Sequence, residues 1–182
     1  MAKRYYTLHA AGCTRELPIL NISDTTAIAA FVILGDVEMT ECAAEALAKI
    51  VPPADVIMTA ETKGIPLAHA LARILGKKRF VAARKSVKGY MEHPLIERDR
   101  SITTAGEQIL VLQDEDAALL RGQKVLLVDD VISTGGSMRA MEALARRAGA
   151  EVCGRAAILA EGDAALRTDI LYLEKLPLFP AE

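Results

Sequence analysis

Two adjacent carboxylates, Asp129 and Asp130, closely precede a run of small polar residues, Ser133-Thr134-Gly135-Gly136-Ser137. Hydroxyls and closely spaced backbone N–H groups at the start of a helix bind anions, and glycines let the backbone approach a phosphate. Paired carboxylates accept hydrogen bonds from the vicinal hydroxyls of a ribose, or hold a divalent cation through water. Together these residue types predict a site for a phosphorylated sugar.

The elements on either side of this motif are a predicted strand and a predicted helix. Residues 125–128 are apolar and indicate a strand buried on both faces, and apolar side chains recur at helical spacing over residues 138–148. A plainer interpretation is an ordinary turn in which Ser133 or Thr134 caps the helix. Capping would use one hydroxyl and one glycine, whereas the motif has two acids, three hydroxyls and two glycines. We therefore favour a binding site.

Two common nucleotide-binding motifs fit poorly. No Gly-Lys-Ser/Thr sequence is present, which argues against the phosphate loop of a P-loop nucleotidase, and the glycine fingerprint of dinucleotide-binding domains is also absent. The run from Val125 to Ser137 instead resembles the phosphoribosyl-pyrophosphate (PRPP) motif of type I phosphoribosyltransferases. The resemblance implies that PRPP is bound through its ribose and 5'-phosphate by Asp129, Asp130, Val131, Ile132, Ser133, Thr134, Gly135, Gly136 and Ser137, with Asp130 also a catalytic residue.

A second tetrapeptide, Glu61-Thr62-Lys63-Gly64, follows a predicted strand at residues 56–59. Taken alone, this tetrapeptide is best interpreted as a turn at a glycine, with Glu61 and Lys63 as exposed charges. It resembles the family's pyrophosphate loop, which runs Glu-Ser-Arg-Gly in adenine phosphoribosyltransferases. The resemblance implies that Thr62, Lys63 and Gly64 contact pyrophosphate, and that the loop contains a cis peptide bond.

A long polar excursion at residues 85–102 follows the strand predicted at residues 80–83. Such loops are commonly lids, although a solvated hairpin without a role is the alternative. In the family, a flexible hairpin after an Arg-Lys pair closes over the reaction centre and excludes water. The resemblance assigns pyrophosphate to three cations, Arg84, Lys85 and Lys88. Glu92 is the candidate catalytic loop acid, and His93 ranks below it.

Alternation of strands and helices along the chain predicts an α/β fold with a parallel, twisted sheet flanked by helices. In such a sheet, ligands bind at the carboxyl ends of the strands. The remaining predicted elements are a hairpin at 4–23, a strand or short helix at 27–34, helices at 39–50 and 67–75, extended pieces at 102–112, and a strand at 152–160. The chain is interpreted as one domain, 1–182, with its core at 36–162. By resemblance, residues 1–34 and 163–182 form a hood that holds the base.

Length and composition agree with one globular domain: the chain has 182 residues, 52% hydrophobic content and a formal charge of −2. The near-balanced charge, without a long basic run, argues against nucleic acid as a partner. No apolar stretch reaches the ~18 residues of a membrane span, and the first residues lack a signal-peptide core. Cys13, Cys42 and Cys153 have no paired spacing and fit a reducing compartment. We expect a cytoplasmic protein without a membrane partner.

The resemblance implies displacement of pyrophosphate from PRPP by a nitrogen of a free base, forming a nucleoside monophosphate. Mg²⁺ is expected as cofactor, held mainly by PRPP without dedicated protein ligands, with water-mediated contacts to Asp129 and Asp130 left open. Ser133 stands where hypoxanthine and guanine enzymes carry an Asp, and residues 173–179 resemble the tails of adenine- and xanthine-type proteins. Adenine is therefore the leading base. Xanthine or guanine, orotate, and a catalytically silent PRPP-binding regulator are the alternatives. A homodimer is expected from the family.

Overall fold

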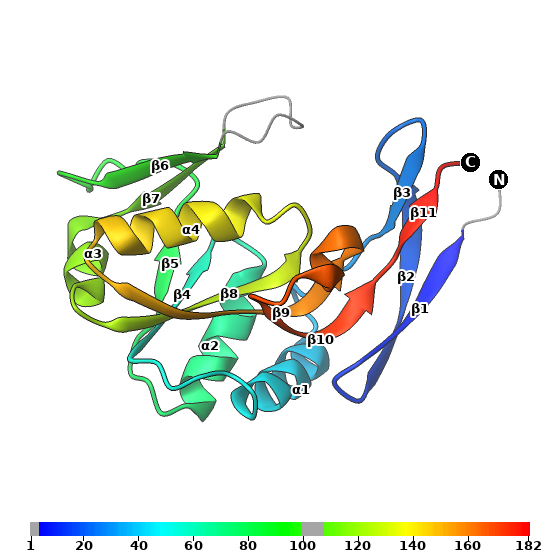
Figure 1. Ribbon diagram of the computed structural model, residues 1–182, viewed down its shortest axis with the longest axis horizontal. Helices are drawn as coiled ribbons and strands as arrows, with labels where there is room; N and C mark the ends of the chain where they lie inside the picture. The colour runs from blue at the N-terminus through cyan, green and yellow to red at the C-terminus, as the bar shows by residue number, and fades with distance from the viewer. Residues whose placement is uncertain (1–3, 100–107) are drawn as a thin grey trace.

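The computed structural model describes residues 4–99 and 108–182, and a five-stranded parallel sheet lies at its centre (Figure 1). The strand order is β10-β9-β8-β4-β5. These strands are β4 (Val56–Ala60), β5 (Val81–Ala83), β8 (Lys124–Ile132), β9 (Glu151–Glu161) and β10 (Leu171–Leu176). The parallel α/β architecture predicted from the alternation of elements is confirmed.

Helices cover both faces of this sheet, and a separate hydrophobic core fills the space on each side. One core contains buried side chains from α1 (Val37–Ala48) and α2 (Gly64–Ile74), and the other contains those of α4 (Gly136–Arg147) and the end of α3 (Asp114–Leu120). Successive side chains of a strand point to opposite faces, so Leu126 lies in the first core and Leu127 in the second. In the described part of the chain, no helix is both long and apolar enough to cross a membrane.

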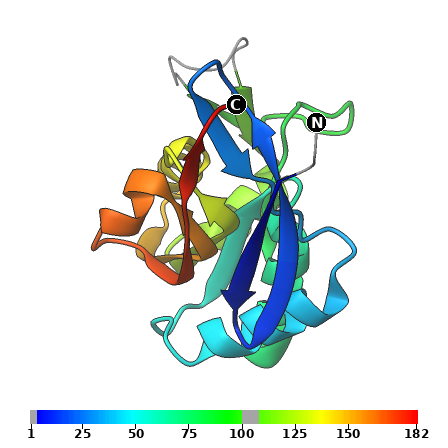
Figure 2. The ribbon, with the colours of Figure 1, turned by 90° about the vertical axis from the view of Figure 1, so that its right-hand side faces the viewer.

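A four-stranded antiparallel sheet stands beside one end of the central sheet (Figure 2). It has the order β1-β2-β3-β11, formed by β1 (Tyr5–Ala10), β2 (Cys13–Asn21), β3 (Thr26–Ala29) and β11 (Leu178–Pro180). We call these four strands, together with segment 30–34 that follows β3, the hood. The predicted hairpin at 4–23 is confirmed, and the undecided segment 27–34 begins as a strand rather than a helix.

The polar excursion leads into a third, two-stranded sheet, formed by β6 (Leu95–Asp99) and β7 (Gln108–Leu112). Arg84, after β5, exchanges backbone hydrogen bonds with Val111 of β7, which ties this hairpin to the central sheet. The last part of the predicted lid, residues 100–102, and the extended piece expected at 102–107 lie outside the described residues.

Two boundaries predicted from the sequence were wrong. β8 does not end at Val128 but continues to Ile132, because its pairing with β9 extends to Ile132 and Ala160; Asp129 and Asp130 therefore lie within a strand. The segment 163–182 was expected in the hood, but β10 pairs with β9 in parallel and extends the central sheet. After the 3-10 helix η1 (Gly162–Leu166) and β10, β11 alone of this segment joins the hood sheet, by pairing with β3.

Asp36 joins the hood to the core. Its Oδ1 accepts a hydrogen bond from the backbone N–H of Met39 at 3.1 Å, which caps α1. Arg15 of β2 donates to both carboxylate oxygens of Asp36, at 2.7 and 2.8 Å. These hydrogen bonds from Arg15 lower the pKa of Asp36. One carboxylate therefore fixes both the start of α1 and the position of the hairpin above it.

Replacing Asp36 by Ala should lower the free energy of unfolding at pH 7 by about 1.5 kcal/mol, since the cap and a partly exposed ion pair are both lost. Because Arg15 depresses the pKa of Asp36 in the folded state, this stabilisation is present above the unfolded-state pKa and is lost as the pH falls through the folded-state value. Urea unfolding at pH 7 and pH 3 measures both effects. Glu38→Ala is the matched control, because the exposed Glu38 also contacts Arg15. Equal losses in the two variants would contradict this account.

Candidate active site

The carboxyl ends of β4, β8 and β9 open into a cavity of about 570 Å³, and the hood forms its opposite wall. A cavity of this size is sufficient for a small-molecule substrate. Its lining comprises Ile28, Ala29, Ala30, Phe31, Val32, Ala60, Glu61, Thr62, Lys63, Lys85, Asp129, Asp130, Val131, Ser133, Ser137, Glu161 and Leu176. Residues predicted in all three sequence motifs therefore meet in one cavity, as expected for the carboxyl edge of a parallel sheet.

The acid pair is the most buried charged group of this cavity. Asp130 is 5% exposed, and its Oδ2 lies 3.3 Å from Lys63 Nζ without a hydrogen-bond partner among the described residues. Asp129 Oδ1 accepts a hydrogen bond from the backbone N–H of Asp130 at 2.9 Å. Burial, and then the neighbouring Asp130 carboxylate, raise the pKa of Asp129 to about 7. A buried acceptor without a donor is unfavourable, so the pair is suited to a ligand that brings hydroxyls or a hydrated cation.

The loop after β8 leaves the start of α4 open. Gly135 is the N-cap residue with φ of +77°, and no side chain of the described residues caps the helix, so the alternative role of Ser133 or Thr134 as a cap is not observed. The first N–H groups of α4 therefore keep their capacity to bind an anion. Ser133 and Ser137 line the cavity beside them, whereas the side chain of Ile132 is buried in the core.

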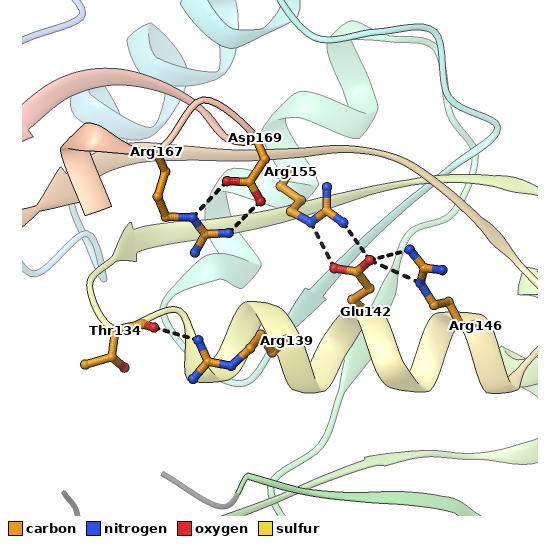
Figure 3. Close-up of polar contacts among 7 residues, drawn as sticks. All are labelled: Thr134, Arg139, Glu142, Arg146, Arg155, Arg167 and Asp169. Carbon is orange, nitrogen blue, oxygen red and sulfur yellow. Dashed lines mark hydrogen bonds and ion pairs between the residues drawn. The ribbon is translucent and has the colours of Figure 1, made fainter. Parts of the chain in front are cut away.

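Arginines support this loop from outside the cavity (Figure 3). Arg139 of α4 donates to the carbonyl oxygen of Thr134 at 2.8 Å. Arg167, held by two hydrogen bonds to Asp169, lies so close to Gly135 that a Cβ there would approach its Nη1 to 2.7 Å. The positive φ of +77° explains why position 135 is glycine, since the flexible arginine side chain could move away from a Cβ.

A second ionic cluster fixes α4 against the sheet. Glu142 of α4 accepts two hydrogen bonds from Arg155 of β9, at 2.9 and 2.6 Å, and two from Arg146 of its own helix (Figure 3). Because Arg155 comes from the strand beside β8, this cluster sets the orientation of the helix whose uncapped first turn faces the cavity. The two parallel hydrogen bonds of a bidentate arginine–carboxylate pair fix the relative orientation of the two side chains.

The segment between β4 and α2 reaches the acid pair from the neighbouring strand. The Glu61–Thr62 peptide bond is cis, as the family resemblance implied. Thr62 and Lys63 line the cavity, and Gly64 is buried directly beneath them. A Cβ at Gly64 would overlap Thr59 Oγ1 and lie 3.2 Å from Asp129 Oδ1, so a glycine allows this loop to lie against the acids. Glu61 forms an ion pair with Arg84, and its Oε2 accepts a hydrogen bond from the backbone N–H of Lys85 at 2.8 Å. These contacts connect this loop to the polar excursion.

The predicted lid residues divide into two groups. Lys85 lines the cavity. Lys88 Nζ donates to Ser86 Oγ at 2.7 Å, and Glu92 and His93 are exposed; none of these three is among the described residues that line the cavity. The roles assigned to Lys88 and Glu92 stay predictions.

Several lining residues were missed by the sequence analysis. Glu161 stands at the end of β9, at the same sheet edge as the acid pair, and Leu176 ends β10 beside it. The position of a lone acid after an apolar strand was a usable signal for Glu161. The hood residues 28–32 carry no polar motif, and their contribution depends on the pairing of β3 with β11.

Asp129→Asn should make the ligand-free protein more stable than wild type at pH 8, by on the order of 2 kcal/mol, with little difference at pH 4. The pKa of Asp129 is raised in the folded state, so the stability of wild type is fully present below the unfolded-state pKa and falls as the pH rises to the folded-state value of about 7. The amide avoids that cost. Thermal unfolding at both pH values measures the difference in stability between the variant and wild type. Asp163→Asn is the control, because Asp163 is exposed. A destabilised variant at pH 8 would contradict the assigned environment.

Comparison with known proteins identifies the family. A family model of the phosphoribosyl transferase domain matches residues 38–174. The chain is 34% identical over 129 residues to the adenine phosphoribosyltransferase of Mycobacterium marinum, a match that covers 70% of this chain and 66% of that protein. It is 29% identical over 141 residues to a candidate purine biosynthesis transcriptional regulator, PurR, of Streptococcus pneumoniae, covering 74% of this chain and 50% of the relative.

Among solved structures, the adenine phosphoribosyltransferase of Thermoanaerobacter pseudethanolicus superimposes with a TM-score of 0.66 at 30% identity, covering 79% of this chain and 84% of that one. The chain spans slightly less than two thirds of the length of the M. marinum enzyme. The matched segment contains the acid pair, the loop after β8 and the segment Glu61–Gly64. The chain belongs to the phosphoribosyltransferase family.

Proposed function

We propose that this protein transfers the phosphoribosyl group of PRPP to a purine base, with adenine as the first candidate, and releases pyrophosphate. The observation that carries the proposal is the single cavity in which the acid pair, the open start of α4 and the cations of two loops face the apolar wall of the hood. The relatives named adenine phosphoribosyltransferase support adenine as the base.

The proposed reaction is a displacement at C1 of the ribose. A base nitrogen forms the new bond to C1, the bond from C1 to the pyrophosphate oxygen breaks with its electron pair, and the N–H proton of the base passes to water or to the departing pyrophosphate. The backbone N–H groups of residues 135–137 would hold the 5'-phosphate, and Asp129 and Asp130 would accept hydrogen bonds from the ribose hydroxyls. Lys63 and Lys85 would neutralise the departing pyrophosphate, and the hood would exclude water from the reacting sugar.

The donor set also fits Mg²⁺. Carboxylate oxygens are the ligands that this ion prefers, and Asp130 Oδ2 is a buried oxygen with no hydrogen-bond partner in the described chain. The described residues contain no cluster of three or more metal-ligating side chains, so PRPP and water would supply most of the coordination. When bound, the ion would reduce the negative charge on the diphosphate. Assembly as a homodimer stays a prediction from the family resemblance.

The second candidate function is PRPP sensing without catalysis. It is favoured by the similarity to the streptococcal regulator, which is 29% identical to this chain over 141 residues. A sensor would need the PRPP-binding residues but no base pocket. The alternatives of xanthine, guanine or orotate as the base keep the same mechanism and change only the contacts to the base.

Lys63→Ala should lower kcat/KM for PRPP by about 100-fold or more, because it removes a cation that faces the leaving group and leaves Asp130 buried without its partner. Pyrophosphate release with Mg²⁺, PRPP and each of five bases (adenine, guanine, hypoxanthine, xanthine and orotate) measures this and identifies the base. Lys78→Ala is the matched control, since Lys78 is exposed and lies outside the cavity.

Selective turnover of adenine would support the full proposal, whereas selective turnover of another base would retain the transferase and reject adenine. If PRPP binds, as measured by calorimetry, but no base is turned over, the sensor is the correct function. The absence of both PRPP binding and turnover would contradict both functions.

A further inference from the structure

One carboxylate of the cavity is not used by the proposed reaction. Glu161 lies at the end of β9, between the acid-bearing strand β8 and the edge strand β10, and its side chain lines the cavity. In the parallel pairing of β9 with β10, Glu161 is the partner of Leu176, which also lines the cavity. Two residues further along, Leu178 pairs with Ile28 of the hood. Glu161 is therefore placed where the central sheet joins the hood.

The carboxylate of Glu161 has no partner of its own. Among residues 4–99 and 108–182 it forms no hydrogen bond or ion pair, while Lys63, the cation whose charge acts on it, already pairs with Asp130. Glu161 is half-buried, and burial raises its pKa. A partly desolvated acceptor without a donor costs free energy, which a ligand carrying N–H groups would recover.

The surroundings of Glu161 match one part of the proposed substrate. The 5'-phosphate is assigned to the start of α4, the ribose to the acid pair, and pyrophosphate to the loop that carries Lys63. The remaining wall is apolar and comes from residues 28–32 of the hood and Leu176. A planar purine needs such an apolar wall together with a few placed polar groups that fix its orientation. Of the carboxylates lining the cavity, Glu161 is the one on the strand next to this wall and without a partner in the described chain.

We propose that Glu161 is a specificity-determining residue that accepts hydrogen bonds from N–H groups of the purine base. This inference rests on the proposed function and adds a contact to the base, which the proposed function does not specify. Bases differ in the N–H groups that they present, so one acceptor at a fixed position favours a base with a donor there. Loss of such a charged hydrogen bond weakens binding of the base while the PRPP contacts remain in place.

Steady-state kinetics of Glu161→Gln test the proposal, with adenine and PRPP varied in turn. We expect the KM for adenine to rise about 10- to 100-fold and the KM for PRPP to stay within about threefold. Glu151→Gln is the matched control, since Glu151 begins the same strand, is exposed and lies at the opposite edge of the sheet. It should leave both constants unchanged. An unchanged KM for adenine, or an equal rise in the KM for PRPP, would overturn the proposal.

A binding measurement separates this inference from the proposed function. Calorimetric titration with adenosine monophosphate needs no turnover, and Glu161→Gln should weaken its binding at least tenfold while PRPP binding is kept, which also shows that the variant is folded. Wild-type protein that binds PRPP but turns over no base would refute the transferase alone. Turnover of adenine by wild type, with unchanged affinity for adenosine monophosphate in the variant, would refute the role of Glu161 alone.

Discussion

The ion pair between Lys63 and Asp130 is the interaction on which the site depends. Two neighbouring carboxylates inside a buried strand would repel one another and lose hydration, and the pKa of Asp129 is raised for these reasons. Lys63, in the loop that follows the adjacent strand β4, offsets part of that cost at 3.3 Å from Asp130. It can approach because Gly64, directly after it, has no side chain to collide with Thr59 or Asp129. The pairing thus compensates part of the cost of burying two acids where a ligand can reach them.

The rest of the fold brings the other parts of the cavity to this pair. The parallel sheet places the ends of β4, β8 and β9 at one edge, and α4 begins there with an open first turn because Gly135 supplies no capping side chain. The contacts of Glu142 with Arg155 fix the direction of that helix. The hood is held from two sides, by the Arg15–Asp36 pair and by the pairing of β11 with β3. The apolar wall therefore comes from segments far apart in the sequence.

Local sequence patterns predicted most of this architecture. The alternation of apolar runs and helical spacing predicted the α/β fold, and the motifs at Asp129–Ser137 and Glu61–Gly64 predicted residues that the structure brings into one cavity. Features determined by pairing between strands were harder to predict. β8 extends through its acids because β9 continues beside it. β10 is short and interrupted by the exposed Glu174 and Lys175, and its place at the edge of the sheet depends on its pairing with β9. Glu161 was missed because it belongs to no recognised motif, although its place directly after an apolar strand was a usable local signal.

The most direct test of this account is the affinity of Mg²⁺-bound PRPP for wild-type protein and for Asp130→Asn, measured by calorimetry. We expect saturable one-to-one binding to wild type and at least tenfold weaker binding to the variant, because an amide lacks the negative charge that pairs with Lys63 and with a bound cation. Equal affinity for both proteins, with both folded, would show that the acid pair does not hold the ribose or the ion. The assignment of the cavity would then be wrong.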